Sequence, residues 1–346
     1  MQWRAFCRRV VTTLIIFSSL CAIALPALAQ QTNDTDKAFF GGKTITYIVA
    51  TKAGGGYDTY ARLIARFLEK YLPGARVQIQ NVPGAGHLVG LNQMSVTQAD
   101  GLTIGTFNTG LIYSQMLGLP EMRVDLRNLD WIGKAASDPR VLVVSTESGI
   151  KSLEDLRDRS SPALFASSGI GTASHNETVF LAKALDLDIR VIPGFGGGEG
   201  EMAMLRGDIQ GTVGSYSSLR PFVENDYGRI LLRIGEGGTL GDSVPAAIDL
   251  VNNETWRGII TVMQTLTEMG RLTAAPGGVP APRLAALRQA YAEALADPEL
   301  LALAAKLQIP INPLPGDAVA RRLTRALSQP SEVIAVMRAL SEGARP

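Results

Sequence analysis

A run of three glycines, Gly54 to Gly56, joins a predicted strand to a predicted helix near the start of the chain. The strand, residues 43–50, is apolar and β-branched, as a buried strand should be. The helix carries apolar side chains at intervals of three and four residues, namely Tyr60, Leu63, Ile64, Phe67, Leu68 and Tyr71. Glycines at such a junction let a ligand approach the backbone, and the free N–H groups of the helix start attract anions. Without a ligand, the same segment is a tight turn.

The same arrangement recurs along the chain. Further predicted strands end in small, polar or glycine-rich loops: 76–80 before 81–87, 102–107 before 108–110, 163–166 before 167–175, 189–192 before 193–198, and 209–213 before 214–216. Ligands of parallel α/β sheets bind beyond the carboxyl ends of the strands. Two groups of such strands therefore predict two α/β lobes, with mainly parallel sheets and a ligand cleft between them.

The first 29 residues have the three parts of a secretory signal peptide: basic Arg4, Arg8 and Arg9, an apolar stretch over 10–25, and Ala27-Leu28-Ala29 before the cut. Both cysteines, Cys7 and Cys21, lie in this segment, so the mature chain is expected to have no disulfide and no thiol chemistry. These features predict a periplasmic protein. The export route, general or twin-arginine, is left open.

Charge excludes some classes of partner. The chain has 33 basic and 32 acidic residues, and loss of the three leader arginines leaves 30 against 32, a net charge of −2. No block of like charge predicts binding to nucleic acid or to a membrane surface. We expect a monomer.

The length of 346 residues favours two domains. A lead-in over 30–42 follows the signal peptide, the first lobe takes 43–138 together with 273–346, and the second lobe takes 139–272. The strand at 140–144 is expected to enter the second lobe, and the helices after 280 to return to the first. Residues 235–257 are glycine-rich and weakly patterned, so the return boundary is the least defined.

Several segments, in consistent order over nearly the whole mature chain, resemble the substrate-binding receptors of tripartite tricarboxylate transporters, the TctC or Bug family. The two most specific are 53–62, AGGGYDTYAR, and 80–86, QNVPGAG; looser ones are Asn92, 99–104, 168–175, 191–197, 205–209 and 275–280. The resemblance implies a fold like that of type II periplasmic binding proteins, whose lobes close over a small carboxylate and deliver it to a membrane permease.

The resemblance also implies how the ligand is held: backbone amides and ordered water from the first-lobe loops hold the carboxylate, and the second lobe selects the rest. The glycine-rich loops of this chain agree, because they offer N–H groups and no arginine. Three departures leave the ligand open: His87 stands where the family often has glycine, 193–198 departs from the usual Pro-Tyr-Lys-Gly form, and 235–272 lacks the late motifs.

The candidate ligand-binding residues are Gly54, Gly55, Gly56, Tyr57, Asp58, Asn81, Gly84, Ala85, Gly86, His87, Asn108, Thr109, Ser168, Gly169, Gly171, Thr172, His175, Gly196, Ser215 and Tyr216. Structural roles compete with this one. Asp58 could cap its helix instead of orienting the first loop or touching the ligand through water, and Asn81 could brace the Pro83-Gly84 turn. The two histidines could make structural hydrogen bonds, and the lobe-two hydroxyls could cap their own helices.

Enzymatic alternatives find little support. Residues 84–90 resemble a loosened dinucleotide fingerprint, but they follow the second strand, and no acidic residue ends the next strand to hold a ribose. Gly42-Lys43-Thr44 lacks the first glycine of a phosphate loop and precedes a strand. The chain has no G-x-S-x-G elbow, and its two histidines lack metal-ligand spacing. We therefore expect no catalytic residues, no metal and no cofactor.

The sequence thus predicts a periplasmic receptor for a small organic anion, a mono-, di- or tricarboxylate, that serves the permease subunits of a tripartite tricarboxylate-type transporter. A nucleotide-dependent oxidoreductase is the first alternative. The second is a ligand-sensing partner of a membrane signalling kinase, which would use the same pair of lobes and which the sequence does not separate from transport.

Overall fold

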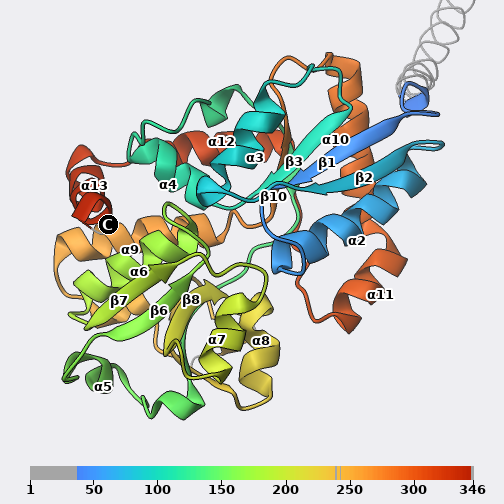
Figure 1. Cartoon of the computed structure of the whole chain (residues 1–346). Coiled ribbons are helices and arrows are strands. Elements are labelled where there is room, and N and C mark those ends of the chain that lie inside the picture. Colours follow the sequence, from blue (N-terminus) through green and yellow to red (C-terminus); the bar gives the residue numbers. More distant parts are fainter. Residues whose placement is uncertain (1–36, 238–239, 242, 344–346) are drawn as a thin grey trace, which may run out of the picture.

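The computed structural model describes residues 37–237, 240–241 and 243–343. The predicted signal peptide lies outside the described residues, and of the predicted lead-in only 37–42 are described. Within that stretch Phe40 is fully buried in the core of the first lobe. The chain forms two α/β lobes, one above the other in Figure 1.

The first lobe contains a six-stranded sheet in the order β11-β4-β10-β3-β1-β2. Its strands are β1 (Thr44–Val49), β2 (Arg76–Asn81), β3 (Thr103–Phe107), β4 (Asp130–Lys134), β10 (Leu272–Ala275) and β11 (Leu314–Pro315). Strand β1 is parallel to β2 and β3, whereas β10 lies antiparallel between β3 and β4. The chain leaves this sheet after β4 and returns to it at β10.

The second lobe contains a five-stranded sheet in the order β7-β6-β8-β5-β9. Its strands are β5 (Arg140–Ser145), β6 (Ala163–Ser167), β7 (Ile189–Pro193), β8 (Gly211–Ser215) and β9 (Gly228–Ile234). Strand β6 is parallel to β7 and β8, and β5 is antiparallel to β8 and β9. Both sheets are therefore mixed: most strands of each run in one direction, as predicted, but β10 and β11 of the first sheet and β5 of the second run the opposite way. The strands that enter from the other lobe, β5 and β10, are not joined to their neighbours by a strand–helix–strand unit, so their direction is free.

The helices are α2 (Gly56–Tyr71), α3 (Leu88–Ser95), α4 (Gly110–Met116), α5 (Leu153–Arg157), α6 (Ala173–Ala184), α7 (Glu199–Leu205), α8 (Tyr216–Glu224), α9 (Glu254–Thr267), α10 (Ala281–Ala296), α11 (Pro298–Lys306), α12 (Gly316–Leu327) and α13 (Ser331–Gly343). The apolar stripe of α2 faces the core of the first lobe, where α10 packs beside it. Within the described residues, no helix is both long enough and apolar enough to cross a bilayer.

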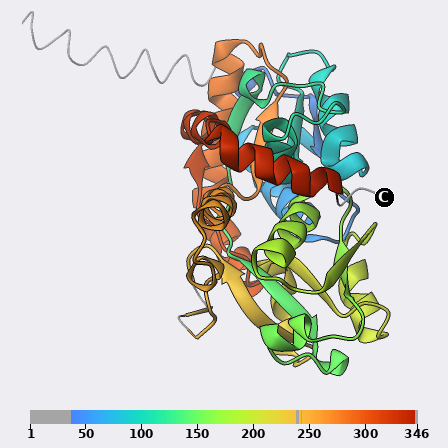
Figure 2. The same ribbon diagram turned by 90° about the vertical axis from the view of Figure 1, so that its left-hand side faces the viewer.

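The C-terminal helices divide between the lobes. Helix α10 packs on α2 and β4, and α12 packs on β4 and α4, so both cover the first lobe. Helix α13 packs instead against α6 and α9 of the second lobe, and Figure 2 shows it lying across the boundary between the two lobes.

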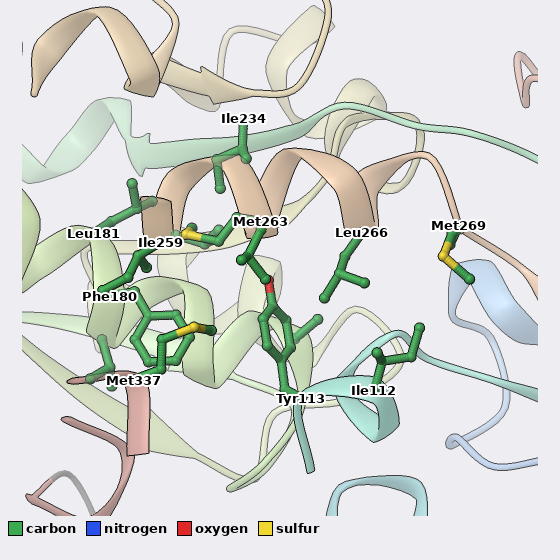
Figure 3. Close-up of a cluster of buried hydrophobic side chains, with 14 of the residues drawn as sticks. Ile112, Tyr113, Phe180, Leu181, Ile234, Ile259, Met263, Leu266, Met269 and Met337 are labelled. Atoms are coloured by element: carbon green, nitrogen blue, oxygen red, sulfur yellow. The ribbon is translucent and has the colours of Figure 1, made fainter. Parts of the chain in front are cut away.

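Buried apolar side chains join the lobes on this side of the molecule. Figure 3 shows Tyr113 of α4, Phe180 of α6, Met263 of α9 and Met337 of α13 in one cluster. All four are fully buried. We call these four residues the apolar seam, because they come from both lobes and from the helix that crosses between them.

Candidate functional site

A cavity of about 930 Å³ lies between the lobes, a size typical of small-molecule sites. The loops after β1 and β2 line it from the first lobe, and those after β6, β7 and β8 line it from the second. Of the candidate residues, those on its wall are Gly54, Gly55, Gly56, Tyr57, Gly84, Ala85, Gly86, His87, Asn108, Ser168, Gly169, Thr172, Gly196 and Ser215. Those that lie off the wall are Asp58, Asn81, Thr109, Gly171, His175 and Tyr216.

Main-chain amides dominate the first-lobe side of the wall. The N–H groups of Gly55, Gly56, Ala85 and Gly86 donate no hydrogen bond to another group in the described part of the chain. Gly55 and Gly56 begin α2, where the first amides have no partner within the helix. The positive potential at the start of the helix and four N–H groups without an acceptor make this wall suited to binding an anion.

Asp58 supports the first loop from behind. Its carboxylate accepts hydrogen bonds from the Gly54 amide at 3.0 Å, Arg62 Nε at 2.8 Å and Asn81 Nδ2 at 2.9 Å. Asn81 Nδ2 also donates to the Thr51 carbonyl at 3.2 Å. Burial would raise the pKa of Asp58, but the bonds from Arg62, Gly54 and Asn81 outweigh it and hold the pKa below its ordinary value. Asp58 thus orients the loop, the N-cap position being Gly55, and Asn81 braces the first loop instead of the Pro83-Gly84 turn.

His87 occupies an unusual position on the cavity wall. Its backbone is left-handed, with φ +81°, and its ring meets the edge of Tyr57 at 6.0 Å between centroids. The side chain is buried, and Nδ1 has no hydrogen-bond partner among the described residues. Burial lowers its pKa to about 4, so the ring is neutral near pH 7.

Polar side chains dominate the second-lobe side. Thr172 Oγ1 accepts from the His175 amide at 3.3 Å and caps α6, and Ser168 Oγ lies 3.1 Å from Ser174 Oγ. His175 Nδ1 is 3.4 Å from Ser167 Oγ, behind the wall. Asn108 reaches across from the first lobe, and its Oδ1 accepts from the Ala173 amide at 3.1 Å.

Four charged residues on the wall were not among the candidates: Lys52, Arg140, Glu201 and Arg271. The expectation of a site without arginine is therefore wrong for the cavity as a whole, although the glycine-rich loops themselves carry none. Arg140 opens β5, and Arg271 directly precedes β10. The one sequence signal that could have identified Arg140 as a site residue is its position as a charged residue at the start of an apolar predicted strand.

Both arginines are held by protein groups. Arg140 forms a buried ion pair with Glu177, and its Nη1 donates to Ser215 Oγ at 3.3 Å. The Arg271 guanidinium lies 4.3 Å from the ring centroid of Tyr57 and 4.8 Å from that of Tyr60, within cation–π range. Its Nη2 donates to Ser218 Oγ at 3.2 Å and lies 3.9 Å from Asp138 Oδ2.

The two lobes touch around the cavity. Lys52 Nζ of the first lobe pairs with Glu199 Oε2 of the second at 2.7 Å. A Cβ on Gly55 would lie 3.4 Å from Gly197 Cα, and one on Gly86 only 2.6 Å from the Ile170 carbonyl oxygen. Glycine at position 86 serves both this close approach and its φ of +62°.

The described residues include no group of three or more His, Cys, Asp or Glu side chains that could hold a metal ion. The chain between residues 60 and 318, about three quarters of its length, matches the profile described as "Tripartite tricarboxylate transporter family receptor". The chain belongs to this receptor family. By its description this is a family of transport receptors and not of enzymes.

The sequence identity between this chain and individual relatives is low. The receptor is 27% identical over 205 residues to "UPF0065 protein in tcbD-tcbE intergenic region" of Pseudomonas sp. strain P51, covering 58% of this chain and 61% of that protein. The alignments span about three fifths of the length of the first relatives that it matches in sequence.

Solved structures share the fold. The periplasmic binding protein BugD has a TM-score of 0.71 at 20% identity, over 87% of this chain and 97% of that one. MatC from Rhodopseudomonas palustris, solved with bound malate, has a TM-score of 0.68 at 20% identity, over 86% of this chain and 99% of that one. These likenesses confirm two α/β lobes. The oxidoreductase alternative is excluded by the family, and residues 85–87 of its supposed fingerprint form a 3-10 turn before α3.

Proposed function

We propose that the receptor captures a small organic acid in the periplasm and binds its carboxylate through the amides of Gly55, Gly56, Ala85 and Gly86. The observation that carries this proposal is that these four donors line the cavity and have no other partner among the described residues. An anion supplies the missing acceptors, and hydrogen bonds to a charged group are stronger than those to a neutral one. Malate in the structural neighbour MatC has the same chemistry.

Binding works by closure of the lobes over the ligand. The donors come from the first lobe, whereas Ser168, Thr172 and Ser215 come from the second, so one ligand can hold both walls together. The contacts between Lys52 and Glu199 and between Gly55 and Gly197 are made only when the loops meet. A bound ligand therefore favours the closed form over the open one.

The proposed cellular role follows from the signal peptide predicted over residues 1–29 and from the family. The mature receptor acts as a monomer and delivers the closed, loaded form to the permease subunits of a tripartite tricarboxylate-type transporter. Deleting the genes for those permease subunits should abolish uptake of the ligand while leaving its binding to the purified receptor unchanged. Uptake that persists in the deletion strain would contradict the assigned partner.

The first experiment is a thermal-shift screen of residues 30–346 against mono-, di- and tricarboxylates, amino acids, sugars and nicotinamide dinucleotides. A ligand at 100 times its dissociation constant stabilises by about 2.7 kcal/mol, which shifts the melting temperature of a protein of this size by a few degrees. Hits should be confined to molecules that carry a carboxylate and should titrate to one site by calorimetry. A screen in which only sugars or dinucleotides stabilise the protein would overturn the proposal.

A further inference from the structure

Glu201 lies on the cavity wall, and no other described residue forms an ion pair or a hydrogen bond with its carboxylate. It lies in the first turn of α7, on the second-lobe side of the cavity. Among the described residues no side chain forms an ion pair with it, and no other residue donates a hydrogen bond to its carboxylate; its own backbone amide is the one donor near it. Burial raises its pKa above the ordinary value.

The cations of the same wall are already engaged. Lys52 pairs with Glu199 at 2.7 Å, Arg140 forms its ion pair with Glu177, and Arg271 lies 3.9 Å from Asp138 and stacks on two tyrosine rings. Each positive side chain therefore has a carboxylate close by, and Glu201 is the charged group of this wall that lacks a counter-charge within the described chain. A site so arranged has no surplus positive charge for a ligand with two or three carboxylates.

A half-buried carboxylate without a cation is unfavourable, and an ammonium group on the ligand removes that cost. A hydroxyl group would supply a hydrogen bond but no charge. The arrangement of donors and acceptor also fits such a ligand, because the unspent amides belong to the first lobe and Glu201 to the second.

We propose that Glu201 is a specificity-determining residue that binds a ligand ammonium, so that the receptor selects aminocarboxylates over plain carboxylates. This inference rests on the proposed function, in which first-lobe amides hold the ligand carboxylate. The carboxylate and the ammonium of one zwitterion then contact opposite lobes. A ligand without the carboxylate leaves the first-lobe amides without an acceptor, and a ligand without the ammonium leaves Glu201 without a counter-charge.

Calorimetry with matched compounds tests the proposal. Butyrate, 2-aminobutyrate and 4-aminobutyrate share one carbon skeleton, and glutarate and glutamate share another, so each set adds an ammonium near to or far from a carboxylate. In at least one set the amino compound should bind wild-type protein about 10- to 100-fold more tightly, the range expected for one charged hydrogen bond.

Glu201→Gln keeps the size of the side chain and removes its charge. This variant should lose that preference while binding the plain acid at least as tightly as wild type. Glu224→Gln is the control, because Glu224 lies on the exposed face of α8, where Arg220 pairs with it; it should match wild type throughout.

Two results would overturn the inference. One is a wild-type receptor that binds every plain acid as tightly as its amino partner, which would show that Glu201 does not bind a ligand ammonium. The other is an equal loss for both members of a pair in Glu201→Gln. Failure of the proposed function looks different, because then neither plain nor amino acids bind.

Discussion

The two sides of the boundary between the lobes are built in opposite ways. On one side the apolar seam of Tyr113, Phe180, Met263 and Met337 is fully buried and contributes side chains from both lobes. On the other side the lobes meet at the cavity through glycine backbone and an ion pair whose two side chains are about half exposed.

This difference indicates which side can open. Separating the seam would expose apolar surface, at about 25 cal/mol for each Å², whereas exposed ion pairs are worth only about 0.2–1 kcal/mol. We therefore expect the seam to remain closed and act as the hinge, while the cavity side opens and shuts. At neutral pH, substitutions in the seam should chiefly change stability, and substitutions in the loops of the cavity should chiefly change ligand affinity.

The largest effect is expected from Phe180→Ala in the seam. Loss of a buried phenyl ring should lower the free energy of unfolding by about 3–5 kcal/mol, measured by urea denaturation without ligand. Affinity for a carboxylate should change less than about threefold. Phe180→Leu, which fills most of the space, should fall between wild type and Phe180→Ala. A variant that stays stable but loses its ligand would break the comparison.

Gly55→Val should have the converse effect. The valine methyl groups would fill the space between Gly55 and Gly197, whose Cα would already lie 3.4 Å from a Cβ, and would cover the amides. Affinity should fall by about 100-fold or more, as expected for two lost charged hydrogen bonds, with little change in melting temperature. Gly55→Ala is the control, because its Cβ makes only ordinary contact, and it should retain most binding. Equal affinity in wild type and Gly55→Val would show that the first loop is not the site.

Acid should lower the free energy of unfolding through His87, which is buried on the cavity wall. Its pKa is about 4 in the folded chain and 6.5 when unfolded, so between these values the unfolded chain binds the extra proton. Stability from this residue is therefore complete above pH 6.5 and falls as the pH falls, by about 2 kcal/mol at pH 5. His87→Asn, which tolerates the left-handed backbone, should show a correspondingly shallower loss of unfolding free energy between pH 6.5 and 5. Parallel pH profiles in the two proteins would contradict this assignment.

The smallest effect is expected at the ion pair across the cavity mouth. Lys52→Ala should weaken ligand binding about two- to fivefold at low salt, since exposed pairs contribute little, and the difference from wild type should shrink in about 0.5 M salt. Arg321→Ala breaks an exposed pair with Asp317 on α12, far from the cavity, and serves as the control. A loss that is as large at high salt would assign Lys52 another role.

The sequence predicted the loops of the site better than its charges. The glycine run could have been a tight turn without a ligand, but similar loops after other strands favoured a site at Gly54–Gly56, and the structure puts those residues on the cavity wall. Arg140 and Arg271 lie 131 positions apart in segments without a motif, and only the crossings between the lobes bring them to one cavity.

The local sequence pattern also failed to predict secondary structure where a segment is short or completely buried. Strand β10, Leu272–Ala275, has four buried residues and no alternation, and it was not predicted as a strand. The weakly patterned stretch from residue 235 leads into α9, whose capping residue Asn253 accepts hydrogen bonds from the Thr255 and Trp256 amides. Strands bounded by glycine loops, such as β6 and β7, were predicted to within one residue at each end.

The amide wall has a consequence for how such a receptor can change over generations. A peptide N–H belongs to every residue except proline, so a small substitution such as Gly55→Ala leaves the donor in place and accessible, whereas a bulky one such as Gly55→Val covers it. A side chain such as Glu201, in contrast, is replaced with its whole chemistry by one substitution. On the proposed function, descendants of this receptor could therefore keep the amides that bind the carboxylate, while point mutations on the second-lobe wall change which organic acid is bound.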